Sequence, residues 1–210
     1  YRHHPLPPMQ LIDERVAWLI SDILSDDNAR VLGFGLNSTL RLDQPAAVKT
    51  GTTSNFHDNW TLGYTSDLVV GVWAGNANQE PMWNVTGLTG AAPVWHQFMR
   101  QISPKLENTG FDRPHGLVQV EVCNLSGLLP TESCPFKRME WFIEGTEPRE
   151  YDSLYHLVTI DNLSGKLADD NTLPENQSQR IVLDLPPQAY KWARTQGLLL
   201  LSDVLDEQVL

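Results

Sequence analysis

The feature that most constrains the fold of this chain is a pair of strand-like runs in residues 60–73. The first run, residues 60–64, is followed by the turn Thr-Ser-Asp and then by LVVGVW at residues 68–73. Two β-rich runs on either side of a short polar turn predict a β-hairpin. Because the second run is nearly all apolar, we expect it to be a central strand covered on both faces.

Helical spacing of apolar residues flanks this hairpin at residues 9–29 and 89–102. One side of the second expected helix is formed by Val94, Trp95, Phe98, Met99 and Ile102. We interpret Trp60, Trp73 and Trp95 as core packing between helix and sheet rather than as a surface that stacks a ligand. An antiparallel sheet packed by helices belongs to the α+β class.

The pattern changes after residues 104–114, and short alternating runs follow. We expect strands over residues 117–122, 139–143, 156–160 and 180–185, and a helix over residues 186–197 that opens on proline and stops on glycine. The sequence therefore predicts two domains, residues 1–108 and a small α+β accessory module at residues 109–210. The second module has no acid–base or metal constellation.

Charge and composition exclude several classes of protein. The formal net charge of −11 argues against a nucleic-acid partner, which requires a basic face. No apolar run reaches the roughly 18 residues of a membrane-spanning helix. The cysteines lack metal-ligand spacing, so we expect no metal and no cofactor. The chain starts at Tyr1 without an initiator methionine, and we interpret it as a piece of a longer protein.

Residues 46–53 read AAVKTGTT, an apolar run that ends in a cation, a glycine and several hydroxyls. One interpretation is a surface strand with Lys49 in solvent. The other is a site that holds a peptide C-terminus, with a cation and hydroxyl for the carboxylate and a strand edge that aligns the peptide. Gly51 would let the substrate approach the backbone. We predict that residues 48–52 form a strand that pairs with residues 60–65, and that residues 68–73 pair on the other side of that strand. Lys49 should then point into an open groove.

Five stretches between residues 13 and 197 resemble one family, in that family's order. KTGTT, followed by DNWTLGYTSDLVVGVWAGN and TGAAPVWHQFM, resembles the C-terminal part of the transpeptidase domain of class A penicillin-binding proteins. VCNLSGLLPTESCP with EWFIEGTEP is similar to the segment after that domain in the C-type bifunctional members. The resemblance implies a β-lactamase-like serine transpeptidase fold, with an antiparallel sheet packed by helices, followed by a small β-rich module.

The resemblance also implies roles for the Lys-Thr-Gly stretch. Lys49 would organise the charge and proton network of the catalytic site. Thr50 and Thr52 would bind the terminal carboxylate of a peptidoglycan stem peptide or a β-lactam, with Gly51 and Thr53 as further substrate-binding residues. The backbone N–H of Thr52 would be an oxyanion-hole donor.

The other two motifs of the family, S-x-x-K and S-x-N, are missing. The nearest match, at residues 38–41, ends in Arg41, which cannot serve as a neutral base. The resemblance therefore places the nucleophile, a glycosyltransferase domain and a membrane anchor upstream of Tyr1. The chain would be an inactive part of a DD-transpeptidase that needs the N-terminal part of the same protein. Its location would be periplasmic, with the parent protein anchored in the bacterial inner membrane.

Cys123 and Cys134 lie in a segment with Gly and Pro turns. Their spacing suits either a small disulfide-closed loop or two free buried thiols. The oxidising compartment implied by the resemblance favours the disulfide.

Two other interpretations belong to different classes. The chain could be a non-catalytic module that binds the cell wall or a partner protein. A free-standing β-lactamase-like hydrolase is disfavoured, because it would need its own serine–lysine pair. His57 and Asp58 could form a dyad, but adjacent loop residues rarely point at one another, so we assign them to loop structure.

Overall fold

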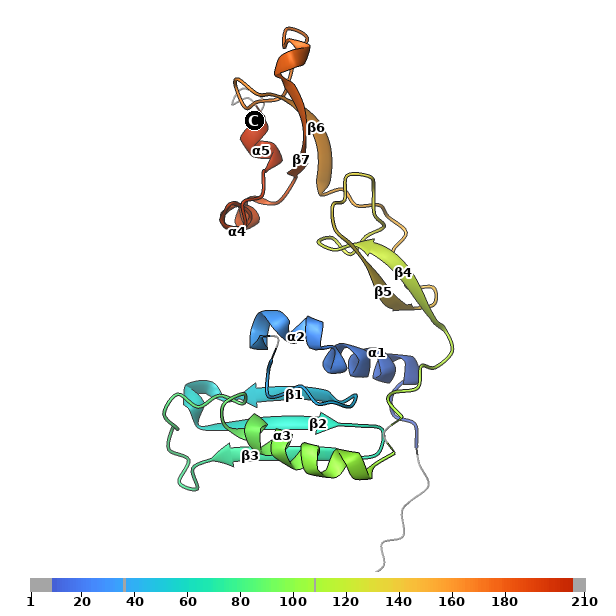
Figure 1. Cartoon of the computed structure of the whole chain (residues 1–210), viewed down its shortest axis with the longest axis vertical. Coiled ribbons are helices and arrows are strands. Elements are labelled where there is room, and N and C mark those ends of the chain that lie inside the picture. The colour runs from blue at the N-terminus through green and yellow to red at the C-terminus, as the bar shows by residue number, and fades with distance from the viewer. Residues whose placement is uncertain (1–8, 36, 108, 206–210) are drawn as a thin grey trace, which may run out of the picture. The chain divides into compact units, whose positions relative to one another are not determined.

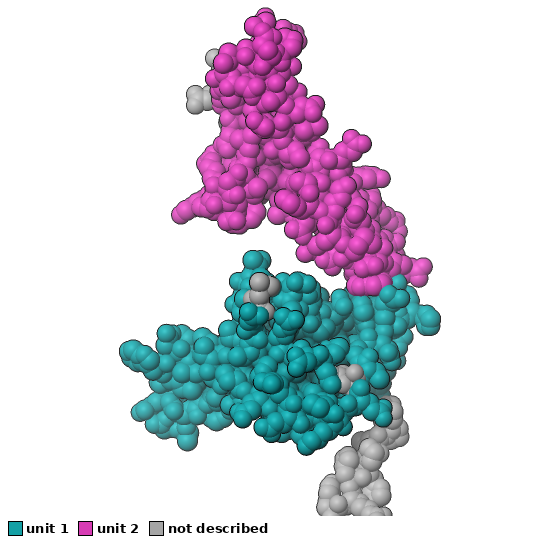
Figure 2. Space-filling view, viewed as in Figure 1, with its two compact units in different colours: residues 1–117 teal, residues 118–210 magenta. Residues whose placement is uncertain are grey.

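The computed structural model describes residues 9–35, 37–107 and 109–205. The chain divides into two compact units, unit 1 (residues 1–117) and unit 2 (residues 118–210) (Figure 2). Helices and antiparallel sheets occur together, so the predicted α+β class is confirmed. The domain limits 1–108 and 109–210 stay a prediction.

The segment predicted as one helix at residues 9–29 is instead two helices, α1 (Glu14–Ser25) and α2 (Asp27–Phe34). Asp26 separates them, with an extended backbone (φ −77°, ψ 111°) and a side chain that accepts a hydrogen bond from Asn28 N at 2.8 Å. Aspartate is among the strongest N-cap residues, so the chain begins a new helix at this point.

The hairpin predicted at residues 60–73 is confirmed within a three-stranded antiparallel sheet. The sheet has the order β1-β2-β3, and its strands are β1 (Ala47–Thr52), β2 (Asp58–Tyr64) and β3 (Val69–Gly75). The register places Lys49 opposite Leu62 and Gly51 opposite Trp60. The predicted pairing of the Lys-Thr-Gly strand with the first arm of the hairpin is therefore correct.

The expectation that residues 68–73 form a central strand covered on both faces is wrong for the described sheet. β2 is the central strand, and Val69 on β3 is 73% exposed. Short connections on both sides of β2 allow it to pair with both of its neighbours in sequence.

The core of unit 1 lies between the sheet and α3 (Ala91–Ile102). α3 packs against β2 and β3, and α1 packs against β1 (Figure 1). The buried apolar residues of this core are Leu40, Ala46, Val48, Ala92, Trp95 and Met99. Trp95 lies directly on β2, where a Cβ at Gly63 would be 2.3 Å from Trp95 Cζ2. Glycine at this position is therefore a packing requirement.

Of the three tryptophans interpreted as core, only Trp95 is buried. Trp60 is 43% exposed and Trp73 is 47% exposed. The register pairs these two residues on β2 and β3, and an odd spacing separates Trp60 from Gly63. Since successive strand residues face opposite sides, Trp60 and Trp73 lie on the face of the sheet away from Trp95.

The apolar side predicted for α3 is also partly wrong. Ala91, Ala92, Trp95 and Met99 are buried. Val94 and Phe98 are 57% and 46% exposed. The buried stripe follows the i, i+4, i+8 row from Ala91, which leaves the adjacent apolar residues outside the contact with the sheet.

Unit 2 contains two strand pairs, β4–β5 and β6–β7, and two short helices (Figure 1). All four predicted strands are present. The helix predicted at residues 186–197 is shorter, because a 3₁₀ turn forms its first part. The elements are β4 (Leu117–Cys123), β5 (Lys137–Ile143), β6 (Tyr155–Asp161), β7 (Gln177–Leu183), α4 (Tyr190–Thr195) and α5 (Leu201–Val204).

A small core joins β7 to the C-terminal helices of unit 2. One cluster of buried residues comprises Leu183, Leu185, Ala193 and Leu200. A second comprises Ile160, Val182 and Val204. Each cluster joins strand residues to residues of the C-terminal helices. The helices α4 and α5 therefore pack as one layer on the β6–β7 strand pair.

Cys123, at the end of β4, is joined to Cys134 by a disulfide. The bond spans 11 positions of the chain, and both residues are buried. It closes the turn between β4 and β5, which is otherwise held by backbone hydrogen bonds such as Cys123 N to Leu128 O at 2.8 Å.

We expect thiol titration of the unreduced, denatured protein to find no free thiol. Replacing both cysteines by alanine should destabilise unit 2 by about 2–3 kcal/mol, because the ring no longer restricts the unfolded chain. Urea unfolding of the two proteins measures the difference. Two reactive thiols in the unreduced protein would contradict the disulfide.

Candidate functional site

The candidate site is built on β1, which carries the Lys-Thr-Gly stretch. Alternation along the strand places Lys49 and Gly51 on one face of the sheet and Thr50 and Thr52 on the other. Thr53 follows the strand and begins the turn to β2. Lys49 is exposed on a strand, and the groove predicted around it stays a prediction.

Some backbone hydrogen-bonding groups of β1 lie along one edge, outside the ladder with β2. Thr53 N donates to Asp58 O at 3.1 Å, which fixes these two residues as a hydrogen-bonded pair of the hairpin. In an antiparallel ladder such pairs alternate, so the N–H and C=O groups of Thr50 and Thr52 point away from β2. The Lys49 ammonium donates to Thr50 O, which agrees with a carbonyl outside the β1–β2 ladder.

The other side of β1 is held in place by Gly87, which precedes α3. Gly87 N donates to Thr52 Oγ1 at 2.9 Å, and Thr61 Oγ1 donates to Gly87 O at 3.2 Å. The Thr52 hydroxyl is thus an acceptor toward Gly87 and retains its own proton for donation to a ligand. Sequence reasoning missed Gly87, because no pattern near residue 87 indicates contact with a strand some 35 positions earlier.

Asn59 is a second residue that sequence reasoning missed. Its side chain is fully buried, and its Oδ1 accepts from Ala91 N at 2.9 Å, at the N-terminus of α3. This contact satisfies one of the free N–H groups at the helix start and ties the helix to β2. Only the fold brings residues 59 and 91 together.

An apolar surface lies on the same face of the sheet as Lys49. It consists of the partly exposed side chains Trp60, Leu62 and Trp73. Exposed aromatic and aliphatic side chains that cluster in this way are typical of interaction surfaces.

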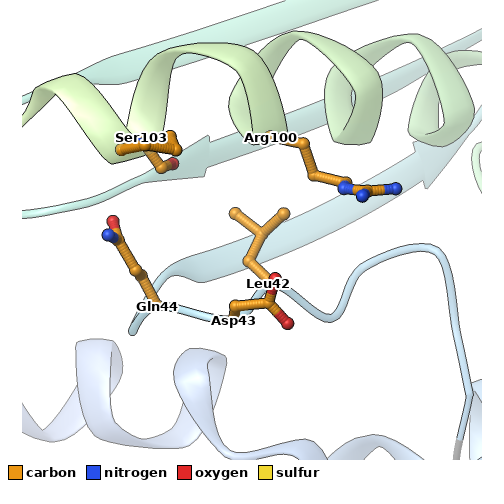
Figure 3. A pocket seen from close by; sticks show the side chains of 6 residues that line it. Leu42, Asp43, Gln44, Arg100 and Ser103 are labelled. Atoms are coloured by element: carbon orange, nitrogen blue, oxygen red, sulfur yellow. The ribbon is translucent and has the colours of Figure 1, made fainter.

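Two hollows in unit 1 are candidate binding sites. One, of about 480 Å³, follows directly on β1 and is lined by Thr53, His57, Asp58, Trp73, Asn76 and Gln79. The other, of about 240 Å³, is lined by Arg100 of α3, by the 3₁₀ turn that follows α3 and by the segment before β1 (Figure 3). Arg100 and Ser103 in this second hollow face Leu42, Asp43 and Gln44, and none of its lining residues belongs to the Lys-Thr-Gly stretch.

Ion-pair partners of Lys49 and groups of metal ligands are absent from the part of the chain that the structure describes. No carboxylate forms an ion pair with Lys49 there. The same residues contain no cluster of His, Cys, Asp or Glu that could hold a metal ion. Across residues 9–205, apart from the undescribed positions 36 and 108, no helix is long and apolar enough to cross a membrane.

Two glycines beside the site differ in what surrounds them. A Cβ at Gly87 would lie 2.9 Å from Thr50 Cβ, 2.9 Å from Trp60 O and 3.0 Å from Gly51 O. A Cβ at Gly51 would meet only Trp60 Cβ, at 4.0 Å. Packing within the described residues therefore requires glycine at position 87 but leaves space for a side chain at position 51.

We expect Gly87→Ala to destabilise unit 1 by about 1–3 kcal/mol, because the new methyl group overlaps the backbone of β1 and β2. Gly51→Ala is the matched control and should change stability by less than about 0.5 kcal/mol. Urea unfolding compares the two variants, and amide NMR shifts of Thr50 and Thr52 report on the position of β1. Equal destabilisation by both substitutions would show that the close approach of Gly87 is not the cause.

Comparison with known proteins finds matches that cover much more of the chain than the candidate site. The family described as penicillin-binding protein 1A, C-terminal domain, matches residues 113–157. Penicillin-binding protein 1A of Clostridium tetani is 33% identical over 120 residues, which cover 54% of this chain and 15% of that protein. Penicillin-binding protein 1C of Escherichia coli K12 is 28% identical over 148 residues, which cover 69% of this chain and 19% of that protein.

A solved structure is similar to the chain as well. The crystal structure of penicillin-binding protein 1A from Haemophilus influenzae superposes with a TM-score of 0.56 at 25% sequence identity, over 67% of this chain and 22% of that one. The chain spans less than a fifth of the length of the two curated relatives named above. These matches confirm the resemblance seen in the sequence: the chain is similar in sequence and fold to the C-terminal part of class A penicillin-binding proteins.

Proposed function

We propose that this chain supplies the substrate-binding strand of a peptidoglycan DD-transpeptidase, which cross-links stem peptides through a serine acyl-enzyme and is acylated by β-lactams. The observation that carries the proposal is the edge of β1. It combines a cation, hydroxyls and outward backbone groups with an unfilled space over Gly51. A peptide can add to such an edge as a further strand.

Each residue of the stretch has a role in this proposal. Thr50 and Thr52 donate hydroxyl protons to the terminal carboxylate of the stem peptide, and Thr53 extends the binding surface. Lys49 supplies positive charge to the same carboxylate and to the proton network around the nucleophile. The outward N–H of Thr52 stabilises the oxyanion that forms when the peptide carbonyl is attacked.

The nucleophile is the missing component. No serine of this chain is followed by lysine three positions later, so the S-x-x-K pair that supplies the required base is absent. We infer that the serine comes from a separate N-terminal part of the same protein, with a glycosyltransferase domain. Trp60, Leu62 and Trp73 support this inference, because their exposed surface on the Lys49 face suits contact with such a part.

The proposal places the protein outside the cytoplasm, with the parent anchored in the bacterial inner membrane. The disulfide between Cys123 and Cys134 supports this location, because disulfides persist in oxidising compartments. Unit 2 would then be an accessory module of the same protein.

Labelling with a fluorescent penicillin tests the proposal. The 210-residue chain should remain unlabelled, because covalent capture requires the nucleophile. Joined to the N-terminal part that carries the serine, it should be acylated. In that complete protein, Lys49→Ala and Thr50→Val should slow acylation about a hundredfold or more, since each removes a group that stabilises charge at the reacting centre.

Lys137→Ala, an exposed lysine of β5, is the matched control and should label at the wild-type rate. Labelling of the isolated chain would overturn the inference about the missing serine. Undiminished labelling of the Lys49→Ala protein would assign the stretch a structural role only, and would favour a non-catalytic module that binds the cell wall or a partner.

A further inference from the structure

The function proposed above uses only Thr53 and Trp73 among the residues that line the hollow of about 480 Å³ beside β1, and it assigns no ligand to the hollow itself. It lies where the β1–β2 turn, the end of β3 and the loop after β3 meet. We call it the Trp73 hollow, after the one aromatic residue among its lining residues Thr53, His57, Asp58, Trp73, Asn76 and Gln79.

Its walls are held by hydrogen bonds between the segments that meet there. Thr53 Oγ1 bridges to the backbone of Asp58, accepting from its N–H at 2.9 Å and donating to its carbonyl at 3.0 Å. His57 Nδ1 donates to Gln79 O at 2.6 Å, and Met82 N donates to Phe56 O at 2.8 Å. The walls of the hollow are therefore held by contacts within the protein, without a ligand.

The side chains of Trp73 and Asp58, two of the lining residues, approach each other over Gly75. A Cβ at Gly75 would lie 2.5 Å from Trp73 Cζ2 and 2.9 Å from Asp58 Cβ, so both side chains close over this glycine. Trp73 keeps about half of its surface exposed, at 47%. Asp58 Oδ1 is enclosed and has no hydrogen-bond partner among the described residues.

The lining favours a cation that donates hydrogen bonds. It contains one carboxylate, two amides and no lysine or arginine, and the imidazole of His57 already uses its Nδ1 in the bond to Gln79 O. Asn76 Nδ2 donates to Glu80 O at 2.9 Å, which leaves Asn76 Oδ1 as an acceptor. An ammonium group has three donors and no acceptor, and it is attracted both by a carboxylate and by the face of an indole. The net charge of −11 adds a favourable field for a cation.

We propose that the Trp73 hollow binds an aliphatic primary ammonium group of a peptide. The ammonium lies between the Asp58 carboxylate and the Trp73 ring, with the amides of Asn76 and Gln79 as further acceptors. Thr53 belongs both to this hollow and to the end of the substrate-binding stretch, so a stem peptide on the edge of β1 would carry its amine here. That last connection rests on the proposed function, whereas ammonium binding itself does not.

Titration of the ¹⁵N-labelled 210-residue chain with n-pentylammonium chloride tests the site. The Trp73 indole N–H resonance, assigned with Trp73→Phe, should shift saturably. Equal concentrations of 1-pentanol, which has the same chain without the charge, should leave it in place. Asp58→Asn keeps the shape and should weaken binding about tenfold, the effect of losing one charge-assisted contact.

Two further variants separate the site from general effects. Gly75→Ala retains every binding group but places a methyl group between Trp73 and Asp58, and should also weaken binding about tenfold, because a snug site has no room for it. Glu121→Gln removes an exposed carboxylate on β4 and should bind like wild type. Near-UV circular dichroism shows whether Asp58→Asn or Gly75→Ala has lost its fold. If one of them has, the binding measured for the other variant tests the proposal.

Several results would overturn the proposal. Equal shifts with 1-pentanol would indicate simple apolar contact, and equal weakening in Glu121→Gln would indicate unspecific charge attraction. A saturable shift with N,N′-diacetylchitobiose but not with pentylammonium would indicate a saccharide site instead.

A peptide pair connects the hollow to β1. In the complete protein, Nα-acetyl-L-Lys-D-Ala-D-Ala should compete with penicillin about tenfold better than its Nα,Nε-diacetyl form, whose amine is neutral. Equal competition by both peptides would overturn the connection to the stem peptide. No competition by either, with pentylammonium binding intact, would count against the proposed function and leave the ammonium site standing.

Discussion

Contact between Trp95 and Gly63 determines how unit 1 is arranged. The indole of Trp95 is fully buried and lies on β2, at a place where any side chain on residue 63 would overlap it. This contact brings α3 against the sheet, and the Asn59 carboxamide then accepts from Ala91 N at the start of the helix. A large aromatic side chain contributes much of the apolar area in a core of this size. The Trp95 contact in the middle of α3 and the Asn59 contact at its start together fix the helix on the sheet.

The position of α3 in turn fixes the edge strand that carries the Lys-Thr-Gly stretch. The segment that leads into the helix passes over β1 at Gly87, which bonds to Thr52 and approaches Thr50 closely. One face of β1 is thereby held by the protein itself. The opposite face, with Lys49 and Gly51, has space and exposed apolar neighbours. The exposed Lys49 lies on the open face, and the backbone groups of Thr50 and Thr52 that point away from β2 lie at the strand edge between the two faces. A ligand can therefore approach β1 along this edge.

The Trp73 hollow follows from the same register. Pairing of Trp60 with Trp73 places both indoles on the face away from α3, where Trp73 closes over Gly75 toward Asp58. The Trp73 hollow and the edge of β1 therefore lie next to each other, and both depend on the alignment of one hairpin. Unit 2 is held by other contacts, the Cys123–Cys134 disulfide and the buried clusters around β7.

The local elements and the similarity to class A penicillin-binding proteins could be predicted from the amino-acid sequence alone. Turn residues between β-rich runs specified the hairpin, alternation specified the short strands of unit 2, and the Lys-Thr-Gly stretch was correctly placed on a strand paired with residues 60–65. These features depend on residues close together in the chain. The sequence did not reveal that β2 is central, that Asp26 divides one helix into two, or that Trp60 and Trp73 are exposed. It also did not indicate that Gly87 and Asn59 support the site. Tertiary structure decided these points, because burial and hydrogen bonding between residues some 30 positions apart depend on which face of a strand meets which helix.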